Sequence, residues 1–377
     1  MDAYPFTPGL QLSGFLYEEA VRPILASHFP GLLYSAGRIG AGSEVLGFDT
    51  PQSMDHDWGP KLQLFLAESD FEPLLNRIEG VLRQELPASI HGIPIDLAWA
   101  RSSEASHGPA VGDPAHHGVS LHTLHSFLKQ GYNIDPTAEL TPADWLSVPQ
   151  QHLRSLVSGA VFTDGLGLLE PLRTRLRWYP HDLWLYQLAA QWQRISQEEP
   201  FMGRCGQAGD ELGSRLVAAR LVRDMVRLGF LMERQYAPYI KWLGTAFNQL
   251  KCARTLAPLF EQILKAGYWQ EREAPLVEAL ETMAAAHNRL GLTTPLSARA
   301  ATFHNRPFMV IQGERFAEAL LQAIQSEVVR SLPIHLGSVD QFVDSTDALD
   351  RIDRLEKLKT MYANTPLTPT PLPLGEG

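Results

Sequence analysis

The sequence contains very little cysteine. Cys205 and Cys252 are the only two in 377 residues, so neither a disulfide framework nor a zinc site built on cysteine can form. The chain also lacks any dense run of lysine and arginine, and its formal net charge is −10 at pH 7. Bulk charge therefore disfavours nucleic acid as a partner, although a local basic groove is compatible with this balance.

Long apolar runs are absent as well. No uncharged apolar stretch approaches the roughly 20 residues that span a bilayer, and the start of the chain, MDAYPFTPGL, lacks the charged beginning and apolar core of a signal peptide. We therefore expect a cytoplasmic protein with no membrane partner. The content of 45% hydrophobic and 20% charged residues is that of an ordinary globular protein, and the length suffices for two domains with separate cores.

The front of the chain predicts a sheet with helices. Residues 12–28 carry apolar side chains at helical spacing, and we expect Pro23 to bend or interrupt this helix. The pattern that follows predicts strands over residues 32–39, 55–66 and 90–99, and a helix over residues 71–86. Strand, helix and strand joined by short connections are typical of an α/β sheet.

Beyond this region the pattern becomes helical. Residues 101–118 are rich in Ser, Gly, Pro and His, which is typical of a loop or linker. Helices are predicted over residues 121–130, 143–158, 183–197, 209–235, 240–251, 257–266, 275–290 and 315–329. We therefore expect an α+β protein with a mixed sheet and helices in residues 1–118, a mainly α-helical domain in residues 119–362, and a disordered Pro-rich tail in residues 363–377.

Three aspartates form the candidate metal site. On a strand, Asp55 and Asp57 would project from the same face. Two carboxylates at such a short distance repel each other unless a cation lies between them. Asp96 stands in an apolar context, HGIPIDLAWA, where a carboxylate is costly unless it is paired or bound to metal. Magnesium takes oxygen ligands and substrate phosphates, and a third acid is what a two-metal nucleotidyl transfer site requires.

A turn of small residues precedes these acids. In Gly40-Ala41-Gly42-Ser43 the glycines let backbone amides approach phosphates, and the serine hydroxyl adds a donor. Each feature has a plain alternative: a strand-to-helix connection for the turn, a solvated turn for the aspartate pair, and an exposed acid on an edge strand for Asp96. Their combination, in this order and spacing, predicts a site for a nucleoside triphosphate and magnesium.

The combined pattern resembles a known superfamily. Gly42-Ser43, a gap of eleven residues, Asp55-His56-Asp57 and then Asp96 on a later strand resemble the DNA polymerase β-type nucleotidyltransferases. The runs GSEVLGFDTPQSMDHDWG, RQYAPYIKWLGTAF and HLGSVDQFVDSTD are similar to one bacterial branch, the domain-of-unknown-function family 4037 (DUF4037). This second resemblance covers nearly the whole chain except the tail.

The resemblance implies an activity and its ligands. It implies a nucleotidyltransferase that moves a nucleoside monophosphate from a triphosphate, with ATP favoured, to a hydroxyl of a small molecule or a protein. Asp55, Asp57 and Asp96 would hold two magnesium ions, and the triphosphate would lie against Gly42 and Ser43. The helical domain would close the cleft, as in aminoglycoside adenylyltransferases.

Two residues of the second half extend this hypothesis. Similar transferases place a glutamate of the helical domain across the cleft, which makes Glu211 the candidate general base; the alternative is an acid that caps the start of a helix. Lys241 is a candidate for contact with the triphosphate as a mobile point charge. Its alternative is a solvent-facing lysine on a helix.

Two departures from the superfamily pattern keep another function open. His56 stands between the acids, where an apolar residue is usual, and the Ser-Asp step common before the pair is stretched to Ser53-Met54-Asp55. Both are compatible with a degenerate nucleotide-binding protein or an antitoxin-like regulator. A group of histidines invites a zinc interpretation, but no HExxH pattern accompanies it, and we interpret it as linker and capping residues: His116, His117, His122 and His125.

Overall fold

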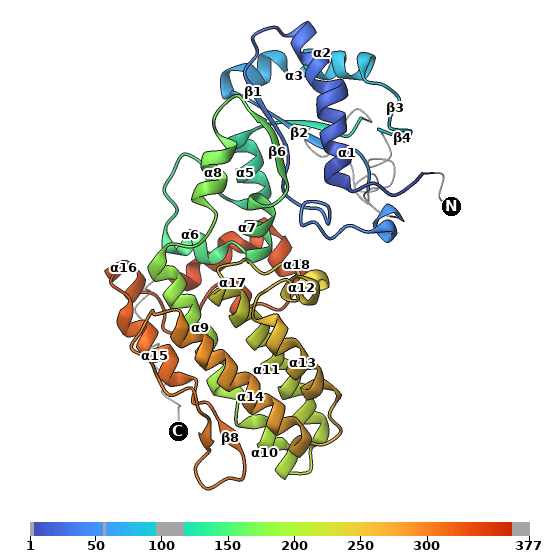
Figure 1. Cartoon of the computed structure of the whole chain (residues 1–377). Coiled ribbons are helices and arrows are strands. Elements are labelled where there is room, and N and C mark those ends of the chain that lie inside the picture. The colour runs from blue at the N-terminus through green and yellow to red at the C-terminus, as the bar shows by residue number, and fades with distance from the viewer. Residues whose placement is uncertain (1–3, 56–57, 96–116, 364–377) are drawn as a thin grey trace, which may run out of the picture. The chain divides into compact units, whose positions relative to one another are not determined.

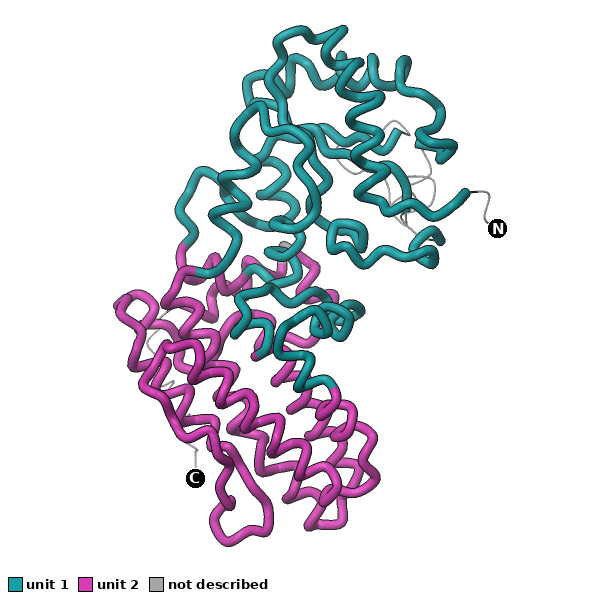
Figure 2. The backbone as a smooth tube through the Cα atoms, viewed as in Figure 1, with its two compact units in different colours: residues 1–140, 148–179, 229–257 teal, residues 141–147, 180–228, 258–377 magenta. Residues whose placement is uncertain are grey.

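The computed structural model describes residues 4–55, 58–95 and 117–363, without the side chains of residues 352 and 353. The chain divides into two compact units (Figure 2). Unit 1 comprises residues 1–140, 148–179 and 229–257, and unit 2 comprises residues 141–147, 180–228 and 258–377. Each unit therefore takes segments from distant parts of the chain.

A mixed sheet of four strands forms the centre of unit 1 (Figure 1). Its order is β5-β2-β1-β6, with β1 (Tyr34–Arg38), β2 (Leu62–Leu66), β5 (Val119–Thr123) and β6 (Ala160–Asp164). Strand β1 runs antiparallel to both β2 and β6, whereas β2 and β5 are parallel. With the helices described below, this sheet confirms the predicted α+β class.

Helices pack against the sheet because their apolar stripes face it. The first helical run comprises α1 (Gly9–Phe15), a π-helical segment (Leu16–Val21) and α2 (Arg22–His28), and a longer helix, α3 (Glu68–Glu85), follows β2. Their buried side chains, among them Leu16, Ile78 and Leu82, join Leu64 of β2 in one core cluster. On β2, Phe65 instead packs edge-on against Phe127 of α5 (Leu124–Tyr132). Strand β2 is buried over its whole length.

Pro23 does not interrupt the first helical run. It lies in the first turn of α2, directly after the π-helical segment. Proline has no N–H to donate to the preceding turn, and π-helical turns, although rare, occur mostly inside α-helices. The predicted helix over residues 12–28 is thus confirmed, with a change of helix type in place of a break.

The strand predicted over residues 55–66 is much shorter than expected. Only Leu62–Leu66 is a strand, and Pro51–Asp55 forms a 3₁₀-helix. Pro60 cannot donate to a ladder, and Gly59 has a φ of +151°. Both features stop the strand from extending back toward the aspartate pair, so the same-face argument does not apply to Asp55.

The strand predicted over residues 90–99 is also different. Its described part is a small hairpin of β3 (Ser89–Ile90) and β4 (Ile93–Pro94). The two residues between them, His91 and Gly92, have φ values of +50° and +80°, which are typical of the tight turn that joins two antiparallel strands. Residues 96–99 lie outside the described part of the chain.

The boundary expected after residue 118 does not coincide with the division into units. Strands β5 and β6, both beyond that residue, complete the sheet of unit 1. Residues 121–123 were predicted to be helical but belong to β5. Helix α5 begins after Thr123, which caps it: the Thr123 hydroxyl accepts a hydrogen bond from the backbone N–H of Ser126. Three further helices lie in unit 1: α7 (Gln150–Val157), α8 (Leu169–Arg175) and α12 (Ile240–Phe247).

Unit 2 is almost entirely helical. Helices α9 (His181–Glu198) and α15 (Glu314–Ala323) pack together, and Trp192 and Phe316 stack with ring centroids 4.5 Å apart. Helices α11 (Glu211–Met232) and α13 (Ala253–Lys265) have residues in both units. The other elements of unit 2 are α6 (Pro142–Ser147), α10 (Phe201–Gln207), α14 (Trp269–Arg289), β7 (Ala301–Thr302), β8 (Met309–Val310), α16 (Glu327–Arg330), α17 (Val339–Phe342), α18 (Thr346–Asp350), α19 (Ile352–Leu358) and a final 3₁₀-helix (Lys359–Tyr362).

The described helices include none that is both long and apolar enough to cross a membrane.

A buried histidine stabilises the core of unit 2. His287 is 1% exposed, and its Nδ1 atom accepts a hydrogen bond from Trp192 Nε1 at 3.2 Å. Burial lowers the pKa of His287 to about 4, because the charged imidazolium loses hydration in the core. The unfolded chain therefore takes up a proton at this residue more readily than the folded chain.

We predict that His287→Gln reduces the acid sensitivity of unit 2. The pKa of His287 in the folded chain lies below its ordinary value. Its contribution to the free energy of unfolding is therefore fully present above about pH 6.5 and is lost as the pH falls toward 4. This loss is at most about 3 kcal/mol. Urea unfolding at pH 7.5 and pH 4.5, followed by tryptophan fluorescence, measures this loss. The variant should lose less than the wild type, whereas a control at the exposed His181, His181→Gln, should behave like the wild type. An unchanged pH dependence in His287→Gln would contradict the assignment.

Candidate functional site

The Gly-Ser turn follows directly after β1. Gly40 has a φ of +90° and Gly42 a φ of +143°, a region of backbone conformation that glycine adopts at no steric cost. A Cβ atom on Gly42 would lie 2.5 Å from a carboxylate oxygen of Glu44, and one on Gly40 would lie 2.7 Å from the hydroxyl of Tyr132. Both positions therefore require glycine.

A buried ion pair holds this turn in shape. The guanidinium of Arg38, the last residue of β1, donates to Oε1 of Glu44 through Nε and Nη2, with the Nε distance at 3.0 Å. It also donates to the carbonyl oxygens of Ile39 and Ala41. Arg38 is 5% exposed and Glu44 is 8% exposed, so water does not screen this pair.

The same contacts leave backbone donors available. In a trans peptide the N–H points away from the preceding carbonyl, and since the Ala41 carbonyl faces Arg38, the N–H of Gly42 points away from that side chain. Gly40 donates its N–H to the carbonyl of Ser155. The N–H groups of Ala41, Gly42 and Ser43 donate to no other residue that the structure describes. Consecutive backbone N–H groups in a turn are the kind of donor found in anion-binding concavities.

Asp55 is the one member of the predicted acid triad that the structure describes. It ends the 3₁₀-helix and is exposed. Its carboxylate makes no hydrogen bond or ion pair with another described residue, so it is available to a ligand. Asp57 and Asp96, like His56, lie outside the described residues.

The chain neighbours of all three acids nevertheless meet. Met54 precedes Asp55 and Trp58 follows Asp57, while Ile93 comes three residues before Asp96. Trp58 and Ile93 are buried in one small apolar cluster with Leu12 of α1, and Met54 packs against it. The described residues that flank the three aspartates in the sequence therefore pack in one part of unit 1.

The predicted metal site stays a prediction. Within residues 4–55, 58–95 and 117–363, no group of three or more His, Cys, Asp and Glu side chains could hold a metal ion. Asp57 and Asp96 lie outside that range. His122 lies inside it, on β5, and its Nε2 forms a hydrogen bond with the hydroxyl of Ser120. Burial lowers the pKa of His122 to about 4.

Glu211 makes a well-defined set of contacts in unit 2. Asp210 caps α11, since its Oδ1 accepts the N–H of Gly213. Oε1 of Glu211 accepts a hydrogen bond from the backbone N–H of Trp269. Its Oε2 accepts a hydrogen bond from Nη2 of the buried Arg272, at 3.0 Å. Burial opposes ionisation of Glu211, but these hydrogen bonds outweigh it and lower its pKa. Both carboxylate oxygens are thus engaged, which favours a structural role; the role of general base stays a prediction.

Lys241 lies in unit 1 on α12, the helix that also carries Trp242. It is exposed on α12, with its Nζ 5.1 Å from the ring centroid of Trp242. Trp242 packs against Phe48 at 5.4 Å between ring centroids, and the N–H of Phe48 donates to the carbonyl of Ser43. Helix α12 is therefore joined to the end of the turn through Trp242 and Phe48, and the phosphate contacts at Gly42, Ser43 and Lys241 stay predictions.

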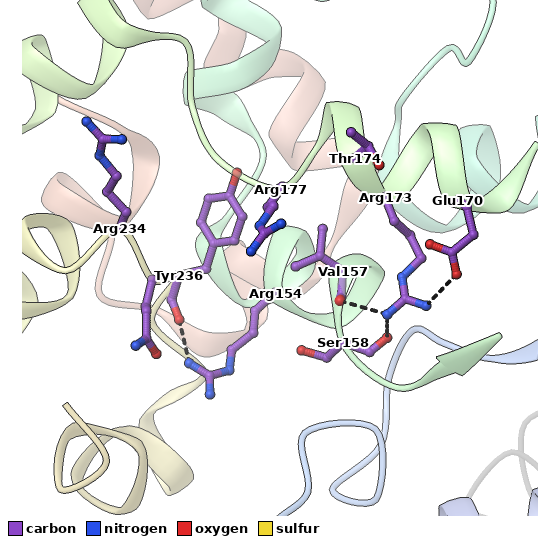
Figure 3. Close-up of a pocket in the computed structure, with 10 residues that line it drawn as sticks. Arg154, Val157, Ser158, Glu170, Arg173, Thr174, Arg177, Arg234 and Tyr236 are labelled. Carbon is purple, nitrogen blue, oxygen red and sulfur yellow. Dashed lines mark hydrogen bonds and ion pairs between the residues drawn. The ribbon is translucent and has the colours of Figure 1, made fainter.

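A pocket that the sequence analysis did not find lies elsewhere in unit 1 (Figure 3). Its volume is about 530 Å³, and four arginines line it: Arg154, Arg173, Arg177 and Arg234. The first and last are 80 residues apart in the chain. Only the spacing of Arg173 and Arg177, four residues apart, gives a local signal of a shared face.

One family comparison gives a match. Residues 145–243 match the family model described as a domain of unknown function, DUF4037. No curated protein and no solved structure matches the chain. The matched segment contains Glu211, Lys241 and every residue that lines the arginine pocket, whereas the Gly-Ser turn and the three aspartates precede it. The match supports the resemblance to DUF4037; membership of the wider nucleotidyltransferase superfamily stays a prediction.

We predict that Glu44→Gln strongly destabilises unit 1. The substitution leaves the buried charge of Arg38 without a partner, which costs about 3–5 kcal/mol. The free energy of unfolding, measured with urea, reports this loss. Glu18→Gln is the control, because it removes the partner of Arg22 from an exposed pair and should cost less than about 1 kcal/mol. Equal losses in the two variants would show that the Arg38–Glu44 pair does not hold the turn.

Proposed function

We propose that this protein is a magnesium-dependent nucleotidyltransferase that moves a nucleoside monophosphate from a triphosphate to a hydroxyl group. The observation that carries the proposal is the Gly-Ser turn, where the N–H groups of Ala41, Gly42 and Ser43 are open to a ligand beside a rigid buried ion pair. Three adjacent amides suit the oxygens of a phosphate chain. The resemblance of the motif spacing to polymerase β-type nucleotidyltransferases supports the same activity.

The donor chemistry of the acids fits magnesium. Asp55 offers an exposed carboxylate that no other described residue engages, and Asp57 and Asp96 would complete the set of oxygen ligands that magnesium prefers. When bound, magnesium neutralises charge on the phosphates and favours ionisation of the attacking hydroxyl.

The protein would bind and orient the two substrates. The triphosphate, with ATP as the favoured donor, lies against the amides of the turn and the Ser43 hydroxyl, and Lys241 approaches it as a point charge. The acceptor oxygen attacks the α-phosphorus in line. A new P–O bond forms, the bond from the α-phosphorus to the bridging oxygen breaks, the hydroxyl proton passes to water, and pyrophosphate leaves. The acceptor is a hydroxyl of a small molecule or of a protein.

Nucleotide binding is the first test. We predict that the wild type binds one of ATP, GTP, CTP and UTP in the presence of magnesium, as measured by calorimetry. The double variant Asp55→Asn/Asp57→Asn should lose this binding, because the carboxylates that hold the metal are gone. Glu68→Gln/Glu72→Gln is the matched control: it removes two exposed charges four residues apart on α3 of the same unit. The control should bind like the wild type.

The outcomes separate the alternatives. No binding of any triphosphate by the wild type would sink the proposal. Binding that is equally weak in both double variants would indicate a loss of net charge, not of a metal site. With a nucleotide labelled at the α-phosphate, label on a protein band identifies a protein acceptor and label on a small product identifies a small-molecule acceptor. Tight binding without release of pyrophosphate, even with cell metabolites and proteins supplied as acceptors, identifies a degenerate nucleotide-binding protein.

A further inference from the structure

The arginine pocket gathers positive charge around a cavity of unit 1 (Figure 3). Four of the lining residues are arginines and one, Glu170, is acidic, so the lining has a formal charge of +3, from four minus one. The whole chain, in contrast, has a net charge of −10. The other lining residues are Val157, Ser158, Thr174, Gln235 and Tyr236.

Two of the arginines are partly used to build the pocket wall. Arg173 donates through Nη2 to the carbonyl of Val157 at 3.0 Å, at the end of α7, and its Nη1 lies 3.5 Å from Glu170. Arg154 donates through Nη1 to the carbonyl of Tyr236 at 2.7 Å. These contacts fix the positions of both guanidinium groups (Figure 3).

Other donors in the pocket are not used. Arg154 Nε is buried without a hydrogen-bond partner among the described residues, and burial lowers the pKa of this side chain. Arg177 is exposed, and its guanidinium makes no hydrogen bond or ion pair with another described residue. In a region where like charges repel, such donors are stabilised when an anion lies between them.

Arg234 occupies an unusual backbone position. The N–H of Gln235 donates to the carbonyl of Phe230 and that of Arg234 to the carbonyl of Leu231, which closes the end of α11. The residue at this closing position usually is glycine, because its φ is positive, and here Arg234 has a φ of +53°. A side chain in this conformation costs stability. Arg234 nevertheless stands at this position and lines the pocket.

We propose that this pocket binds the phosphate groups of a small phosphorylated molecule. Guanidinium groups present planar pairs of donors that match the oxygens of phosphate, and a volume of about 530 Å³ suits a small organic ligand. The site goes beyond the proposed function and does not rest on it, since no residue of the Gly-Ser turn and no predicted metal ligand lines it.

Calorimetry with inorganic pyrophosphate, at low salt and without magnesium, tests the proposal. The wild type should bind pyrophosphate, and Arg177→Gln should weaken binding about tenfold or more, since a hydrogen bond between charged groups is lost. Arg175→Gln is the matched control: Arg175 is an exposed arginine two residues away, and it contacts the carbonyl of Pro136 instead of the pocket. It should bind like the wild type.

A second variant should have the opposite effect. Glu170→Gln removes the acidic residue of the lining and should tighten pyrophosphate binding, while Asp55→Asn/Asp57→Asn should leave it unchanged, which separates this site from the proposed metal site. The proposal is overturned if the wild type does not bind pyrophosphate, if Arg175→Gln and Arg177→Gln weaken binding equally, or if citrate binds as tightly as pyrophosphate. The last outcome would identify a site for carboxylates.

Discussion

The buried guanidinium of Arg38 is the contact on which the candidate site depends. It binds the carbonyls of Ile39 and Ala41 and the carboxylate of Glu44, so one side chain joins the end of β1 to both sides of the turn. Because these carbonyls face inward, peptide geometry directs the N–H of Gly42 outward. The outward direction of this N–H, on which the proposed phosphate binding depends, therefore follows from an interaction that the phosphate itself would not touch.

The two anion sites proposed for unit 1 use different chemistry and share one helix. The turn offers backbone N–H groups, which carry partial charge, whereas the pocket offers guanidinium groups, which carry full charge. Helix α7 contributes to both, since Ser155 accepts the N–H of Gly40 and Arg154 lines the pocket. Arg154 also lies over the ring of Phe48, at 5.6 Å from its centroid. A shift of α7 would thus alter both sites together.

The spacing of apolar residues correctly predicted those elements in which it follows one periodicity, that of a helix or that of a strand. The strand expected over residues 32–39 and the helix over 71–86 correspond to β1 and α3. The strand predicted over residues 55–66 was wrong in the part before residue 62 that the structure describes, because Pro60 cannot join a ladder. Residues 121–123 were assigned to a helix although they form β5. A short apolar run fits both the helical and the strand periodicity. Residues 121–123 form a strand because they pair with β2.

The sequence by itself determined the residue types and their order: glycines where the backbone needs positive φ, Ser43 beside them, Asp55 after them, and the α+β class. Tertiary structure alone decided which distant segments meet. Arg154 contacts Tyr236 across 82 positions of the chain, and β6 pairs with β1 across more than a hundred. Periodicity reports which face of one element is apolar and carries no information about partners that far away, so the arginine pocket could only be found in the folded chain.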